Sequence, residues 1–102
     1  MHTERKKRSE YEIIFDILKQ FGETGIKRTQ LMFRSRLNYR VMLKYLSRLA
    51  ARGFVEERNG MFYITDRGAK LLEILDAYIS KKNELVGILK EIKELYPEIN
   101  LS

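Results

Sequence analysis

The most concentrated chemistry in this chain is a run of cationic side chains with no carboxylate among them. Guanidinium and ammonium groups on a folded surface bind phosphates, because each phosphate that they neutralise releases condensed counterions. A regular array of phosphates is the expected partner, and duplex DNA is the first candidate. Residues 24–55 contain no Asp or Glu but include eight cations: Lys27, Arg28, Arg34, Arg36, Arg40, Lys44, Arg48 and Arg52.

Residues for other kinds of chemistry are sparse. The chain has no cysteine and one histidine, His2, within a polar stretch, so neither a nucleophilic triad nor a Cys-based zinc site can be assembled. No glycine-rich phosphate loop is present, and Asp66 and Asp76 are interpreted as solvated or dipole-favoured helix charges. We therefore expect no catalytic residue, metal, cofactor or small-molecule substrate, and a protein that is not an enzyme.

Composition and charge bound the architecture. The 102 residues are 44% hydrophobic and 33% charged, which predicts one globular domain with an appended helix. Residues 1–65 carry 14 Lys and Arg against 7 Asp and Glu, whereas residues 66–102 carry 6 against 7. This asymmetry predicts a half that faces nucleic acid and a half with another task. The absence of cysteine, of a long apolar run and of a signal-like start predicts a cytoplasmic protein without a membrane segment.

The first half of the chain reads as a basic arm and three helices. Residues 1–8 are expected to be a flexible arm. Ser9 is predicted to cap a first helix, with Glu12 completing a capping box and Gly22 ending the helix. A short second helix is expected near residues 28–35. Its predicted inward side chains, on hydrophobicity alone, are Leu31, Met32 and Phe33.

The third helix is predicted over residues 39–52, between an Asn38 cap and Gly53. Its apolar residues share one sector of a helical wheel, and its cations lie opposite. A helix that docks in a DNA groove needs this segregation, with one face in the core and the other on bases and phosphates. The two sectors consist of Met42, Tyr45, Leu46 and Leu49, and of Arg40, Lys44, Ser47 and Arg48.

A hairpin is predicted next, because Asn59-Gly60 joins two β-prone runs, residues 54–58 and 61–64. Three helices followed by a hairpin form a winged helix-turn-helix. The predicted fold is therefore mainly α: a winged helix-turn-helix over residues 9–65, followed by one long helix over residues 66–96 and a tail, residues 97–102.

The long helix is predicted to begin after a Thr65 cap, to stop at Pro97 and to carry a heptad seam. Leu71, Leu72 and Leu75 should pack on the winged domain, and a second copy should cover the rest, because so wide an apolar stripe is otherwise an aggregation hazard. Lys82 interrupts the seam and favours an antiparallel pair, in which it faces Leu85 of the partner and snorkels outward. The predicted dimer interface is Leu71, Leu75, Tyr78, Ile79, Lys82, Leu85, Val86, Leu89, Ile92 and Tyr96.

Two stretches carry a resemblance to a known group. They are residues 27–49, with Lys27-Arg28-Thr29 and Leu37-Asn38-Tyr39, and residues 63–72, with Tyr63-Ile64-Thr65-Asp66-Arg67-Gly68. The chain resembles archaeal winged-helix proteins with a C-terminal coiled-coil helix, above all the small basic "10a" chromatin proteins of crenarchaea. The resemblance implies a homodimer joined by an antiparallel coiled coil, with a DNA-binding winged head on each chain, and a protein that is associated with the nucleoid. Some relatives in that group act as transcriptional regulators.

The residues expected to touch DNA come from four places: the arm, the second helix, the third helix and the hairpin tip. Several have a plain alternative. The arm is otherwise a solubilising tail, the tip with Arg58 otherwise only completes the core, and Gln30 is otherwise an ordinary surface residue. The predicted DNA-binding set is Arg5, Lys6, Lys7, Arg8, Arg28, Thr29, Gln30, Arg34, Arg36, Asn38, Tyr39, Arg40, Lys44, Ser47, Arg48 and Arg58.

Three functions remain open. An architectural chromatin protein binds many sequences through phosphates, whereas a repressor reads base edges in a palindromic site. High basicity and small size favour the first. A winged-helix module for protein interaction is the third, and it would require a mixed or apolar surface on the third helix.

Overall fold

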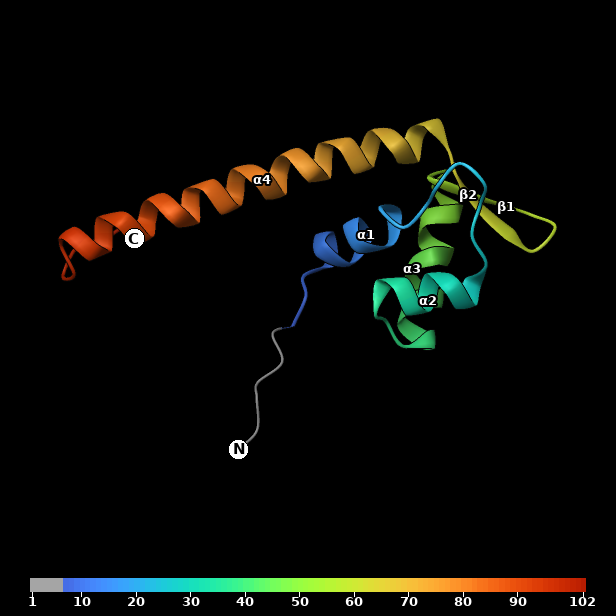
Figure 1. The fold of residues 1–102 in the computed structure, drawn as a ribbon, viewed down its shortest axis with the longest axis horizontal. Helices are drawn as coiled ribbons and strands as arrows, with labels where there is room; N and C mark the ends of the chain where they lie inside the picture. The colour runs from blue at the N-terminus through green and yellow to red at the C-terminus, as the bar shows by residue number, and fades with distance from the viewer. Residues whose placement is uncertain (1–6) are drawn as a thin grey trace.

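Three short helices and a hairpin form a head, from which one long helix projects (Figure 1). The computed structural model describes residues 7–102, so Arg5 and Lys6 of the predicted set lie outside the described residues. The elements are α1 (Glu10–Leu18), α2 (Arg28–Ser35), α3 (Tyr39–Ala51), β1 (Val55–Arg58), β2 (Met61–Ile64) and α4 (Asp66–Leu95). The predicted fold class, a winged helix-turn-helix with a long C-terminal helix, is confirmed.

The core of the head lies where α1, α2, α3 and the hairpin meet. The predicted inner sector of α3 is confirmed, since Met42 and Leu46 are at most 2% exposed and Tyr45 and Leu49 are also buried. Ile26 joins the hairpin through an isolated bridge to Phe62, which adds a strand-like contact outside β1 and β2. The core consists of Ile17, Leu18, Ile26, Leu31, Met42, Tyr45, Leu46, Leu49, Val55 and Phe62.

Helix α1 starts as the sequence predicts but ends earlier. The Glu12 carboxylate accepts hydrogen bonds from the backbone N–H and the hydroxyl of Ser9, at 2.8 and 2.9 Å. The prediction that Gly22 ends the helix is wrong, because α1 stops at Leu18. The N–H of Phe21 donates to the Leu18 carbonyl at 3.2 Å, so the last turn tightens to an i to i+3 pattern that satisfies the free carbonyls.

Helix α2 places its side chains as predicted except for Phe33. Leu31 is buried and Met32 packs on the core, but Phe33 is 75% exposed, so its predicted inward position is wrong. An eight-residue helix has room for only one buried stripe, and Ser35 occupies the remaining inward position, with its hydroxyl donating to the Leu31 carbonyl. Arg36 then closes α2 in the left-handed region, at φ 58°.

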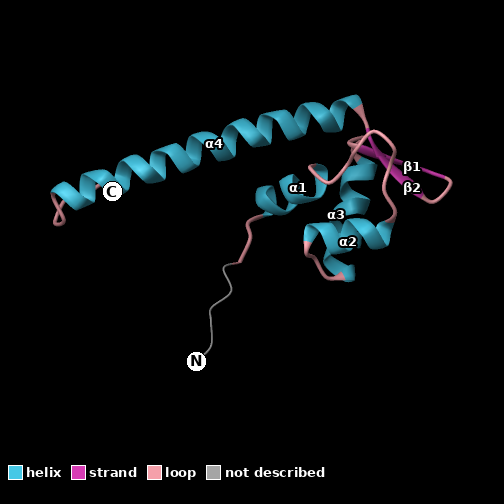
Figure 2. Cartoon of the chain, in the orientation of Figure 1, coloured by secondary structure: helices cyan, strands magenta, loops and turns pink. Residues whose placement is uncertain are grey.

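The caps of α3 and the hairpin turn follow the sequence. The Asn38 side chain accepts from the Val41 N–H at 2.9 Å, and Gly53 ends the helix at φ 80°. Asn59 and Gly60 have φ of 52° and 80°, which are the positive values of a type I′ turn. Strands β1 and β2 pair antiparallel with Val55 opposite Ile64, and together they form the wing (Figure 2).

Helix α4 begins on the head, packs on its core as far as Leu75 and keeps contact with α1 as far as Lys82. The Thr65 hydroxyl accepts from the Gly68 N–H at 3.0 Å and donates to the Gly53 carbonyl, which ties the start of α4 to the end of α3. The predicted packing of Leu71, Leu72 and Leu75 on the head is confirmed. The C-terminal half of α4 extends away from the head, which gives the molecule its 57 Å long axis (Figure 1).

One polar cluster links α4 to α1 beyond the packed leucines. The Lys82 ammonium donates to the Tyr11 hydroxyl at 2.6 Å, and the Tyr11 and Tyr78 rings meet edge to face at 5.1 Å. The hydrogen bond from Lys82 to Tyr11 is the main cause that raises the pKa of Lys82 above its ordinary value. Lys82 is therefore an anchor between α4 and α1 within one chain. Among the described helices, none combines the length and apolarity needed to cross a bilayer.

Candidate nucleic-acid interface

The outer face of α3 is a continuous polar surface. Arg40, Lys44 and Ser47 are exposed, one helical turn apart, on the side opposite the buried sector. No acidic side chain within residues 7–102 forms an ion pair with Arg40 or Lys44, although the Lys44 ammonium lies 5.3 Å from the Tyr45 ring centroid. Tyr39, at the start of the helix, is 48% exposed. This face therefore presents two unpaired cations and hydrogen-bonding groups in the row that a groove-docking helix requires.

Arg48 lies at the edge of this face rather than at its centre. Its guanidinium forms an ion pair with Glu10 of α1 at 3.0 Å and lies 5.5 Å from the Tyr45 ring centroid. Both partners are more than half exposed, so the pair is weak and a phosphate is able to compete for Arg48. Sequence spacing placed Arg48 with Arg40 and Lys44 but gave no sign of Glu10.

Helix α2 contributes a second group of exposed polar residues. Arg28, Thr29, Gln30 and Arg34 are all exposed. Gln30 also has a local role, since its side chain accepts from the Lys27 N–H at 3.3 Å at the start of α2. Arg28 lies 3.9 Å from Glu57 and 5.3 Å from the centroid of Phe62, so it bridges α2 to the wing.

The wing carries one predicted site residue, Arg58. Its guanidinium stacks 4.0 Å from the Tyr63 ring centroid and pairs with Glu56 at 3.5 Å. The other acidic residue of β1, Glu57, is the partner of Arg28. The two carboxylates reduce the positive charge of the hairpin on its β1 strand.

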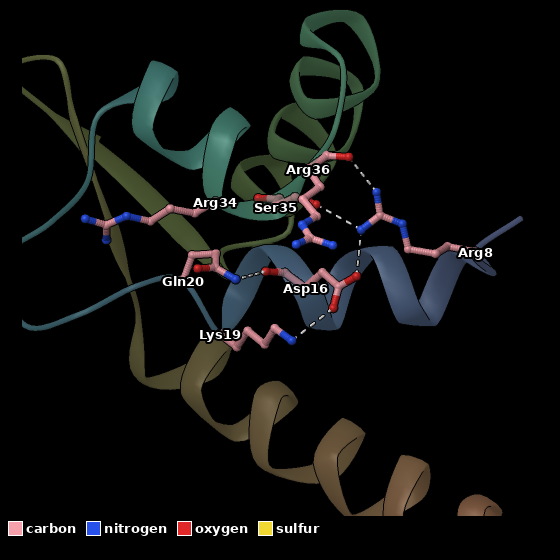
Figure 3. Close-up of a pocket in the computed structure, with 7 residues that line it drawn as sticks. All are labelled: Arg8, Asp16, Lys19, Gln20, Arg34, Ser35 and Arg36. Carbon is pink, nitrogen blue, oxygen red and sulfur yellow. Dashed lines mark hydrogen bonds and ion pairs between the residues drawn. The ribbon is translucent and has the colours of Figure 1, made fainter. Parts of the chain in front are cut away.

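The described end of the N-terminal arm is held against the head (Figure 3). The Arg8 guanidinium donates to Asp16 at 2.7 Å and to the carbonyls of Ser35 and Arg36 at 2.9 and 2.8 Å. These contacts join Arg8, two residues before α1, to α1 itself and to the end of α2. Arg8 therefore has a structural role that its place in a basic run did not indicate, whereas Lys7 is exposed.

A basic groove surrounds that contact. It is lined by Arg8, Asp16, Lys19, Gln20, Arg34, Ser35 and Arg36 (Figure 3). Its single carboxylate, Asp16, is paired with both Arg8 and Lys19. Four cations thus face one carboxylate, so the groove keeps a net positive charge, to which Arg34 and Arg36 contribute. The structure thus brings these two predicted residues together beside the start of α3.

The predicted dimer residues fall into two groups along α4. Leu71 and Leu75 already contact the head of their own chain, and Tyr78 and Lys82 contact Tyr11. Beyond them the apolar stripe is open: Leu85 is 60%, Val86 56% and Leu89 42% exposed. Tyr11 was not singled out from the sequence, because nothing local connects it to a lysine 71 residues away.

The part of the chain that the structure describes holds no cluster of metal-ligating side chains.

Comparisons with known proteins agree with this architecture. A family profile described as winged helix-turn-helix matches residues 7–83. Uncharacterized protein MJ0287 of Methanocaldococcus jannaschii is 35% identical over 71 residues, which cover 70% of this chain and 73% of that protein. A second protein of that organism, MJ0290, is 30% identical, and the chain spans 33% of its length.

Solved structures give the same result. Sso10a-2, a DNA-binding protein from Sulfolobus solfataricus, superposes with a TM-score of 0.77 and 28% identity, covering 87% of this chain and 97% of that one. The MarR family transcriptional regulator SPO1453 from Silicibacter pomeroyi has a TM-score of 0.58 and 21% identity, covering 81% and 62%, and shares the fold. The resemblance to archaeal winged-helix proteins of the 10a group is confirmed. The chain belongs to the winged helix-turn-helix family.

Proposed function

We propose that this protein is a homodimeric, architectural DNA-binding protein that contacts duplex DNA through α3. The observation that carries the proposal is the outer face of α3, where Arg40, Lys44 and Ser47 are exposed in a segment without a single carboxylate. Sso10a-2, a DNA-binding protein by its name, shares the fold along nearly its whole length, which supports the same partner here.

The more basic half of the chain is expected to bind DNA. Residues 9–65 bind DNA, with α3 in the major groove and with Arg28, Arg34 and Arg36 on backbone phosphates beside it. Arg40 and Lys44 are the candidates for base edges. The basic arm, through Lys7 and the residues before it in the sequence, is expected to track phosphate or to enter a minor groove.

Residues 66–96 are expected to form the dimer interface. The open stripe at Leu85, Val86 and Leu89 needs cover, and a second copy supplies it in an antiparallel coiled coil over residues 66–96. Lys82 favours this orientation because a parallel pair would place two ammonium groups in one layer. Its hydrogen bond to Tyr11 holds the ammonium at the rim of the seam, on the side of α1.

Charge reversal on α3 tests the proposal. Arg40→Glu with Lys44→Glu should weaken binding to a duplex by about 100-fold, because two cationic contacts each contribute about 1–3 kcal/mol. Fluorescence anisotropy across a salt series measures the affinity, and light scattering checks that the molar mass is unchanged. Lys81→Glu with Lys90→Glu is the matched control, since both lysines are exposed on α4 and the net charge changes equally. Full binding by the α3 variant would reject α3 as the DNA-contacting helix.

The same assay separates the two DNA-binding roles. An architectural protein should bind several unrelated duplexes with similar affinity and a steep dependence of log affinity on log salt. One duplex that binds about 10³-fold more tightly than the others would instead identify a sequence-reading repressor. Absence of binding at low salt would favour a protein-interaction module.

A further inference from the structure

A groove on the head lies beside the start of α4 and has no occupant in the described chain. It is formed where α1, α3 and α4 meet, with a volume of about 420 Å³. Its open apolar walls are Ile14, Phe54 and Leu71, each only partly buried, and Arg48 and Arg52 line it as well. The groove thus combines an apolar lining with two guanidinium groups.

The charges at this groove are only partly balanced. Arg48 is paired with Glu10, which also lines the groove. No acidic side chain among residues 7–102 pairs with Arg52, and the backbone carbonyl of Arg52 accepts from the Arg67 side chain at 3.0 Å. The end of the groove near the first turn of α4 is therefore cationic, which favours an occupant that combines apolar side chains with a carboxylate.

The residues that follow α4 have this composition. Tyr96 is 57% exposed and Leu101 is 44% exposed, with Glu98 between them. They cannot reach the groove of their own head, because a helix of 30 residues separates them from it, a length of about 45 Å. The C-terminal end accordingly lies at the far end of the molecule from the head (Figure 1).

The antiparallel register brings these residues to the groove of the other copy. In the pair proposed above, Lys82 faces Leu85 of the second copy and, continuing outward, Leu71 faces its Tyr96. Helix α4 has ended at this point, and a turn closed by the Ile99 N–H and the Tyr96 carbonyl at 3.0 Å keeps Glu98 beside this end of the helix. Glu98 is thereby expected near the first turns of the second copy's α4, where Arg67 is hydrogen-bonded to the Arg52 backbone. The apolar and charged groups of the two surfaces are therefore brought to the same end of the pair.

We propose that the groove between α1, α3 and α4 is the docking site for residues 96–101 of a second copy, with Tyr96 seated against Leu71 and Glu98 paired with Arg52. The inference rests on the proposed antiparallel homodimer. It extends the interface from the coiled coil to the back of α3, so that each chain end holds the helix with which the other chain contacts DNA.

Tyr96→Trp provides the first test. The chain contains no tryptophan, so this residue would be the sole indole reporter. Molar mass by light scattering and emission wavelength are measured at the same concentration. A dimer whose emission lies at shorter wavelength than that of the unfolded protein is expected. A dimer with emission like that of the unfolded protein would overturn the docking site but leave the dimer standing, whereas a monomer would overturn the dimer itself.

A charge swap in the Tyr96→Trp background then identifies the groove. Arg52→Glu should move the emission toward longer wavelength and weaken the dimer several-fold, and adding Glu98→Arg should restore both. Arg58→Glu at the wing is the control with the same change of charge. Circular dichroism monitors folding, and Arg52→Gln is the milder variant if the reversal disturbs α3. If the emission stayed at short wavelength after Arg52→Glu, residue 96 would be buried at another site, as in a parallel pair. That result would overturn the assignment.

Discussion

At the scale of single residues, Gly68 shows how tightly α4 is joined to the head. A Cβ added at Gly68 would lie 2.0 Å from the Phe54 carbonyl oxygen and 2.8 Å from Ile64 Cγ1. Gly68→Ala must therefore push α4 away from Phe54 and from the end of β2, at a cost of about 2 kcal/mol or more in the free energy of unfolding. Gly87→Ala, on the same helix with open space around it, should instead stabilise by roughly 0.5–1 kcal/mol. Urea unfolding compares them, and equal effects would contradict the close packing at Gly68.

Other residue-scale features divide into those visible in the sequence and those that are not. Caps are visible, because Ser9, Asn38 and Thr65 each act within three residues along the chain. The contacts of Arg8 with the Arg36 carbonyl and of Lys82 with Tyr11 span 28 and 71 residues. Only the folded chain brings such pairs together. The basic run around Arg8 therefore suggested DNA contact, whereas in the structure the Arg8 side chain links α1 to the end of α2.

At the scale of elements, the turn between α2 and α3 combines backbone strain with charge. Arg36 adopts φ 58° and ψ 42°, a left-handed conformation that costs a residue with a Cβ about 1 kcal/mol. Arg36→Gly and Arg36→Ala both remove the guanidinium, but only the glycine relieves the strain. We expect the free energy of unfolding, measured with urea, to be about 1 kcal/mol higher for the glycine variant than for the alanine variant. Both should lose DNA affinity equally in the anisotropy assay. Equal stability would show that the turn stores no strain, and unchanged affinity would remove Arg36 from the DNA surface.

The elements were predictable to the extent that their signals are local. Periodicity and caps defined α2, α3, the hairpin and α4, and Asn59-Gly60 defined the turn type. The end of α1 was not predictable, since a tightened last turn after Leu18 competes with the glycine signal at Gly22. The exposed Phe33 was missed for a related reason, because hydrophobicity alone does not give the face of so short a helix.

At the scale of the whole molecule, the proposed antiparallel pair sets the spacing of the two heads. Leu71 marks the level at which each head sits on α4, and Leu71 of one copy lies at the level of Tyr96 of the other. The heads are then separated along the coiled coil by about 25 residues, or about 38 Å. This distance is close to one turn of duplex DNA, about 34–36 Å. Two heads on one face of a single duplex are therefore compatible with the pair.

A monomeric variant tests this spacing. Leu85→Asp with Leu89→Asp places charges in the open seam and should give a monomer by light scattering, since both side chains lie on the exposed stripe. The slope of log affinity against log salt is about −0.9 for each phosphate neutralised. If both heads of the dimer hold one duplex, the slope should fall to about half in the monomer.

Ser80→Asp with Gly87→Asp is the control. It adds the same charge on the opposite side of α4 and should change neither the molar mass nor the slope. An unchanged dimer mass would show that the seam is not the interface. A monomer that keeps the full slope would mean that the two heads bind separate duplexes, so that the dimer bridges DNA instead of lying along it.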